Sequence, residues 1–97
     1  MRQLANPWWQ RVAGDYIEIG LTAVALNQLG TIRWLDGPVP ETKILAAWPC
    51  VQIIAQNWST DLIWPVAPSR VVRRSEHWHH LNPVIDSTTV LLTIEKI

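Results

Sequence analysis

The sequence predicts a mainly β domain with two short helices. Short apolar runs alternate with clusters of Gly, Pro, Asn, Asp and Ser along most of the chain, a pattern typical of strands joined by turns. The 97 residues, 48% of them hydrophobic, are enough for one modest core, and no linker-like composition divides them. We therefore expect residues 1–97 to form a single domain, with residues 1–7 as a flexible N-terminal segment.

The first part of the chain predicts a hairpin followed by a helix. Residues 9–22 read as two strands around a Gly14-Asp15 turn, and the second strand alternates polar and apolar side chains. Thr22 has the chemistry of a helix N-cap, because its hydroxyl can accept a hydrogen bond from a free backbone N–H. A short helix is expected over residues 23–29, and Gly30 is expected to end it.

Three strands are predicted next. Residues 31–35 form the first, which the turn-forming segment 36–40 stops. Residues 42–47 and 50–55 are expected to form the other two. Pro49 lacks a backbone N–H, so it has to lie at a strand start or a bulge.

A second hairpin is predicted over residues 54–66, where two apolar runs flank a polar stretch and Pro65 follows. Asn57 is the residue best able to accept a left-handed backbone at the bend. Asn57 and Trp58 are therefore expected at an exposed tip.

The last part of the chain predicts one strand, one helix and a closing strand. Residues 69–73 form the first strand. Ser75 can cap a short helix through residue 80, which ends before Asn82-Pro83. Residues 84–89 are expected to be a loop and residues 90–94 a closing apolar strand.

The charge balance argues against binding to nucleic acids or acidic membranes. The formal net charge is zero and the pI is about 6.8. Arg70, Arg73 and Arg74 form the basic cluster, which we interpret as a solvated face. Cys50, the single cysteine, rules out an intrachain disulfide and fits a reducing compartment. With no signal peptide and no membrane-spanning run in the sequence, we expect a cytoplasmic protein.

The aromatic composition is unusual, with seven Trp, one Tyr and no Phe. Trp combines a large apolar face with one N–H that requires a partner when buried. We expect Trp9, Trp34 and Trp48 to take the core positions that Phe and Tyr usually occupy.

Two stretches resemble the H-protein of the glycine cleavage system. The family's opening pattern W-x-R-x-x-G-D-x-x-x-x-G-I-T is matched by Trp9, Arg11, Gly14, Asp15, Gly20 and Thr22. Its lipoyl-attachment pattern E-S-V-K-A-x-S-D-x-x-S-P-V is matched by Asp61, Pro65 and Val66. The register runs without a gap from Trp9 to Val66. The resemblance implies the barrel-sandwich hybrid fold of lipoyl and biotinyl domains.

In that register the attachment lysine of the family falls on Asn57, its glutamate on Ile54 and its first serine on Ala55. A lysine amine is a nucleophile once deprotonated, whereas the lone pair of an amide nitrogen is delocalised into the carbonyl. The position is therefore a degenerate lipoylation site, and lipoate is not expected as a cofactor. Neither Lys43 nor Lys96 lies at the predicted tip.

Other chemistry has weak support. A metal site is one hypothesis for the cluster of Glu76, His77, His79 and His80. On a helix, at most two of these side chains can lie on the same face, which is too few to hold a metal ion. We therefore interpret the cluster as a solvated helix face and expect no metal. Cys50 has no neighbour that would activate a thiol and is interpreted as a buried cysteine. No Ser-His-Asp spacing, phosphate-binding glycine loop or CxxC pair is present. We do not expect an enzyme.

The resemblance leaves three hypotheses for function. The first is a module without lipoate that binds a protein, as an accessory subunit of an enzyme complex. The second is a small-ligand binding domain with a Trp-lined cleft, and the third is a glycine cleavage carrier that uses another acceptor. Self-association is compatible with each. The residues expected to contact a protein partner are Gln56, Asn57, Trp58, Ser59 and Trp64.

Overall fold

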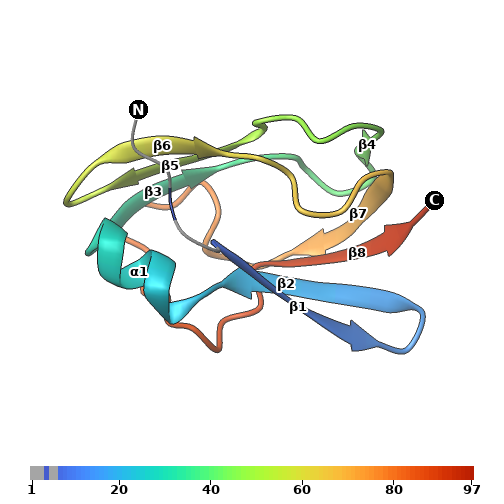
Figure 1. The fold of residues 1–97 in the computed structure, drawn as a ribbon, viewed down its shortest axis with the longest axis horizontal. Coiled ribbons are helices and arrows are strands. Elements are labelled where there is room, and N and C mark those ends of the chain that lie inside the picture. The colour runs from blue at the N-terminus through green and yellow to red at the C-terminus, as the bar shows by residue number, and fades with distance from the viewer. Residues whose placement is uncertain (1–3, 5–6) are drawn as a thin grey trace.

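The computed structural model describes residue 4 and residues 7–97, and it is mainly β (Figure 1). The chain forms eight strands and one helix across the described residues, in the order β1 (Trp8–Ala13), β2 (Tyr16–Leu21), α1 (Ala23–Leu29), β3 (Ile32–Asp36), β4 (Lys43–Ile44), β5 (Val51–Ala55), β6 (Ser59–Leu62), β7 (Ser69–Arg74) and β8 (Leu92–Lys96). The expectation of a flexible segment over residues 1–7 falls mostly outside the described residues.

The strands form two antiparallel sheets. The five-stranded sheet has the order β1-β2-β8-β7-β4, and the three-stranded sheet has the order β3-β5-β6. Figure 1 shows the two sheets as layers, with α1 at one end. This arrangement is a β-sandwich, which confirms the expected mainly β class. No helix within the described residues is long and apolar enough to cross a membrane.

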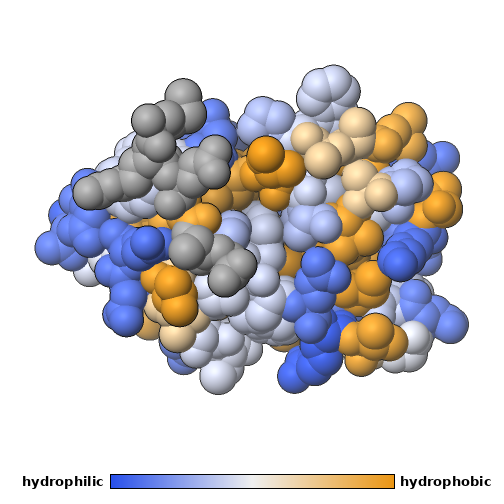
Figure 2. Space-filling view, viewed as in Figure 1, coloured by the Kyte–Doolittle hydropathy of each residue, from blue (hydrophilic) through white to orange (hydrophobic). Residues whose placement is uncertain are grey.

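The core lies between the sheets because the strands alternate buried and exposed side chains. In β5, Val51, Ile53 and Ala55 are buried, whereas Gln52 and Ile54 are exposed. Several large hydrophobic side chains remain exposed elsewhere. Figure 2 shows that one face of the molecule mixes hydrophobic side chains with hydrophilic ones.

Two tryptophans are buried in the core, and both indole N–H groups are satisfied. Trp64 donates from Nε1 to Ser69 Oγ at 2.8 Å, and Ser69 Oγ donates to the Val66 carbonyl at 2.6 Å. Trp78 donates from Nε1 to the Leu91 carbonyl at 2.9 Å. Bonding of this kind removes the cost of burying a polar group.

The expectation that Trp9, Trp34 and Trp48 fill the core is wrong for Trp48, which is 61% exposed. Trp9 and Trp34 are half-buried. The segment before Trp48 turns, since the Trp48 N–H donates to the Ala46 carbonyl at 2.9 Å. This local turn also shortens the strand expected over residues 42–47 to the two residues of β4.

Helix α1 forms where the sequence predicts it. Thr22 is the N-cap, and its side chain accepts a hydrogen bond from Ala25 N at 3.2 Å. Gly30 ends the helix with φ 74°, a conformation that favours glycine, and its N–H donates to the Leu26 carbonyl at 2.9 Å.

The second helix, expected from Ser75 to His80, is wrong. Residues 76–79 form turns, and His79 and Asn82 have positive φ values of 58° and 51°, which no right-handed helix accommodates. Their N–H groups donate to the Leu35 and Arg33 carbonyls at 3.0 and 2.8 Å. The backbone therefore bonds to β3 instead of to its own preceding turn.

We predict that Trp64→Phe lowers the free energy of unfolding by about 2 kcal/mol, because it removes the donor to Ser69 and leaves a void in the core. Urea denaturation of both proteins measures this difference. Trp48→Phe is the matched control and should change stability by less than about 0.5 kcal/mol, as expected at an exposed site. Equal losses in the two variants would contradict the assigned role of Trp64.

Candidate functional site

The site predicted from the sequence is the turn between β5 and β6. Ile54 pairs with Ser59 at the end of the ladder, and the Ala55 N–H donates to the Trp58 carbonyl at 3.2 Å. Gln56 and Asn57 therefore lie at the bend, and Asn57 is exposed as the sequence predicts. The expectation of an exposed position is wrong for Trp58, which is half-buried because its side chain packs against the core. The expected left-handed backbone at Asn57 is wrong, because the non-glycine residues described with positive φ are Glu41, His79 and Asn82.

The turn is held against the C-terminal end of α1 by backbone hydrogen bonds. Asn57 N donates to the Leu29 carbonyl at 3.0 Å, and Gln56 N donates to the Thr31 carbonyl at 2.8 Å. The last carbonyls of a helix have no partner inside the helix, so donors from elsewhere must satisfy them. The hairpin turn supplies those donors here.

Side chains of the turn strengthen this contact. Asn57 Nδ2 and Trp58 Nε1 both donate to the Gln28 carbonyl, at 2.9 and 3.2 Å. Gln56 Oε1 accepts a hydrogen bond from Thr31 N at 3.3 Å. The tip is therefore a fixed surface attached to the helix.

The five residues expected to contact a partner differ in accessibility. Gln56, Asn57 and Ser59 are exposed, and Trp58 is half-buried against the core. Trp64 is 1% exposed, so the expectation that it lines a partner-facing surface is wrong. The residues next to Trp64 in the sequence do not signal that it is buried. The partner of its indole N–H, the Ser69 hydroxyl, comes from the following strand.

The chemistry available at the tip is hydrogen bonding. Asn57 Oδ1, the Gln56 side-chain NH2 and Ser59 Oγ make no hydrogen bond to other described residues, so they can accept or donate toward a partner.

Lysine is absent from the tip. Lys43 and Lys96 lie on β4 and β8, opposite Arg70 and Ser69, at the other end of the long axis in Figure 1.

A groove of about 380 Å³ adjoins the tip. It shares Gly30 and Thr31 with the contact between helix and turn, and its remaining lining residues are Leu26, Asn27, Ile32, Asn82, Pro83, Val84 and Ile85. No Trp lines this groove, and no Trp lines two further cavities of about 250 and 280 Å³. The expectation of a Trp-lined cleft is therefore wrong for these three cavities.

Two of the three histidines considered as metal ligands, His77 and His79, have separate partners. His77 Nδ1 lies 2.8 Å from Ser75 Oγ, whereas His79 hydrogen-bonds through Nε2 to Asp36 Oδ1 and stacks on Trp34 with ring centroids 5.8 Å apart. Across the described residues, no three His, Cys, Asp or Glu side chains come close enough to hold a metal ion. The contacts of His77 and His79 are with neighbouring side chains of the fold.

Two ionisable groups have shifted pKa values. The hydrogen bond from His79 lowers the pKa of Asp36 below its usual value, and partial desolvation opposes this effect. Desolvation raises the pKa of the half-buried Cys50 thiol. Because the thiolate is the nucleophilic form, this shift makes Cys50 less reactive.

Comparison with known proteins gives one partial similarity. No family model matches the chain, and no solved structure matches it. The chain is 39% identical over 46 residues to the probable glycine cleavage system H protein of Haloarcula marismortui, which is 47% of this chain and 36% of that protein. The similarity supports an H-protein-like relationship, and the matched segment spans about a third of that relative.

We predict that the Asp36–His79 pair makes stability depend on pH. A carboxyl whose pKa is lower in the folded state stabilises the fold above its unfolded pKa of about 3.8, and this stabilisation is lost as the pH falls through the folded value. Asp36→Asn should therefore lower the free energy of unfolding at pH 5–6, by less than about 1 kcal/mol for an exposed pair.

The difference between Asp36→Asn and the wild type should disappear on acidification to about pH 2. Urea denaturation at a series of pH values measures it. Asp61→Asn is the control, because Asp61 is exposed on β6 and its carboxylate has no recorded partner among the described residues. If the stability difference between the wild type and Asp36→Asn grew on acidification, the Asp36–His79 pair would not be the source of the pH dependence.

Proposed function

We propose that this chain is an H-protein-like module that carries no lipoyl group and binds another protein, as an accessory subunit of an enzyme complex. The partial similarity to an H protein supports the relationship. The two-layer antiparallel architecture agrees with a barrel-sandwich hybrid. The observation that carries the proposal is Asn57 at the hairpin turn, where the resembling family has its attachment lysine.

The geometry at Asn57 supports the absence of lipoylation. An amide nitrogen is not a nucleophile, and here Nδ2 donates to the Gln28 carbonyl at 2.9 Å. Lys43 and Lys96 are exposed but lie on strands away from the turn. A ligase that recognises an amine at a hairpin tip therefore finds no acceptor there.

The same geometry supports binding of a protein. The turn is fixed by backbone bonds to Leu29 and Thr31, so ordering it costs little entropy when a partner binds. Gln56, Asn57 and Ser59, whose side chains have free polar atoms, are neighbours of the half-buried Trp58 in the chain. An aromatic side chain with polar neighbours is a common recognition surface.

A second candidate function is small-ligand binding in the groove beside the tip. The lining includes Leu26, Ile32 and Ile85 as apolar walls and Asn27 and Thr31 as polar groups. A volume of about 380 Å³ lies within the range of small-molecule sites. A ligand there would contact Thr31 and would loosen the turn if it displaced the Gln56 side chain.

We predict that lipoate-protein ligase, ATP and lipoate leave the wild-type chain unmodified, because no amine lies at the tip. The matched variant Ile54→Glu/Ala55→Ser/Asn57→Lys restores the three residues of the family pattern. It should gain the mass of one lipoyl group, and intact-mass spectrometry measures both results. Modification of the wild-type chain would overturn the proposal.

We predict that Gln56→Ala/Asn57→Ala weakens capture of a partner at least about tenfold, by removing buried hydrogen bonds at the interface. Pull-down with the tagged chain, followed by titration of the captured protein, measures this effect. Trp58→Ala is less suitable, since Trp58 also packs against the core.

The control for this experiment is Gln10→Ala, because Gln10 is exposed on β1 in the other sheet. Circular dichroism should show that both proteins remain folded. If the double variant and Gln10→Ala capture the partner equally, the tip is not the binding surface.

A further inference from the structure

The three arginines of β7 differ in their partners. Arg70 donates from Nε and Nη2 to Glu95 Oε1 at 2.9 and 2.6 Å, and from Nη1 to Glu41 Oε2 at 2.6 Å. Arg74 donates to the Gly37 and Pro38 carbonyls and lies 3.3 Å from His79 Nδ1. Arg73 makes no hydrogen bond or ion pair with any residue that the structure describes. Its charge is therefore available to a ligand.

The register of the five-stranded sheet places Arg73 beside Thr93. A bulge between Val71 and Arg73 shifts β7 so that Arg73 is opposite Thr93, and β2 places Glu18 opposite Thr93 on the other side. Paired residues on neighbouring strands share a face. Glu18, Thr93 and Arg73 therefore form one row across the outer face of the sheet.

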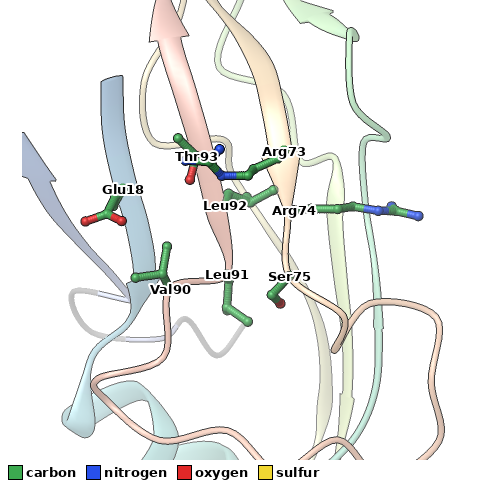
Figure 3. A pocket seen from close by; sticks show the side chains of 8 residues that line it. All are labelled: Glu18, Arg73, Arg74, Ser75, Val90, Leu91, Leu92 and Thr93. Carbon is green, nitrogen blue, oxygen red and sulfur yellow. The ribbon is translucent and has the colours of Figure 1, made fainter. Parts of the chain in front are cut away.

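Figure 3 shows this row beside a cavity of about 250 Å³. The Arg73 side chain extends toward Thr93, whereas Arg74 points away from it. The cavity is lined by Glu18, Arg73, Arg74, Ser75, Val90, Leu91, Leu92 and Thr93. Its walls therefore combine one unpaired cation, two hydroxyl groups and an apolar segment.

Thr93 lines the same cavity and contributes a hydroxyl group to its wall. Thr93 is 4% exposed, and its hydroxyl has no hydrogen-bond partner among the described residues. An acceptor bound in the cavity beside Arg73 would provide that partner.

The neighbouring charges favour a singly charged ligand. Glu18 is compensated by Arg11, which donates from Nε at 2.9 Å and from Nη2 at 2.5 Å. Arg74 also lines the cavity, but its guanidinium points away and bonds to the Gly37 and Pro38 carbonyls. Arg73 is therefore the cation directed toward a ligand beside Thr93. A phosphate dianion would be only half neutralised by Arg73, whereas a carboxylate matches one guanidinium in charge and shape.

We propose that this cavity binds the carboxylate of a small aliphatic monocarboxylic acid. Arg73 donates to the carboxylate, the Thr93 hydroxyl donates to one of its oxygens, and Val90 and Leu91 contact the aliphatic chain. The site lies on the outer face of the five-stranded sheet, so it is separate from the hairpin tip and does not depend on the role proposed for the tip.

Titration of the full chain with sodium butyrate, followed by ¹H–¹⁵N NMR at constant ionic strength, tests this site. We expect saturable shifts of the backbone amides of Thr93, Ser75 and Leu91. Arg73→Gln should weaken butyrate binding at least about tenfold, the usual size of a lost charge-assisted hydrogen bond. Arg33→Gln, the same change at an exposed arginine of the other sheet, should leave binding unchanged.

Two further measurements, on the variant Thr93→Val and with inorganic phosphate, test the roles of the hydroxyl and of the ligand charge. Thr93→Val removes the hydroxyl at constant shape and should weaken binding severalfold without loss of stability, since the hydroxyl has no partner in the described structure. Inorganic phosphate should bind more weakly than butyrate. The proposal fails if butyrate gives no saturable shift, if Arg73→Gln and Arg33→Gln behave alike, or if phosphate binds more tightly.

Discussion

The contact between the end of α1 and the β5–β6 turn fixes the position of the hairpin tip. Three donors, Asn57 N, Asn57 Nδ2 and Trp58 Nε1, reach the carbonyls of Gln28 and Leu29. Helix α1 follows β2 of the larger sheet, and the turn belongs to the smaller sheet. Satisfying the helix carbonyls therefore also joins the two layers, and neither the helix end nor the turn can move alone.

This contact gives Asn57 two roles. Its amide cannot react as an amine would, and the same amide fixes the turn to the helix. The cavity beside Arg73 lies on the other sheet, away from this contact.

Local signals in the sequence predicted both hairpins, helix α1 and the bend at Asn57, since turn residues and caps act within a few residues. Features that depend on contacts between residues far apart in the sequence could not be predicted from these local signals. The turns around His79 and Asn82 replace a helix because their N–H groups bond to β3. Trp64 is buried, with its indole N–H bonded to the Ser69 hydroxyl of the next strand, whereas Trp48 follows a local turn and is exposed. The unpaired arginine of β7 likewise depends on a bulge that the sequence does not signal.

The position of β8 has a consequence for how the chain folds. This strand is the last in sequence order but lies between β2 and β7. During synthesis, the β1–β2 hairpin and the β7–β4 pair remain unjoined until residues 92–96 leave the ribosome. The larger sheet therefore closes late, through pairings between residues far apart in sequence, which is the situation in which β proteins fold slowly and depend most on protection from aggregation.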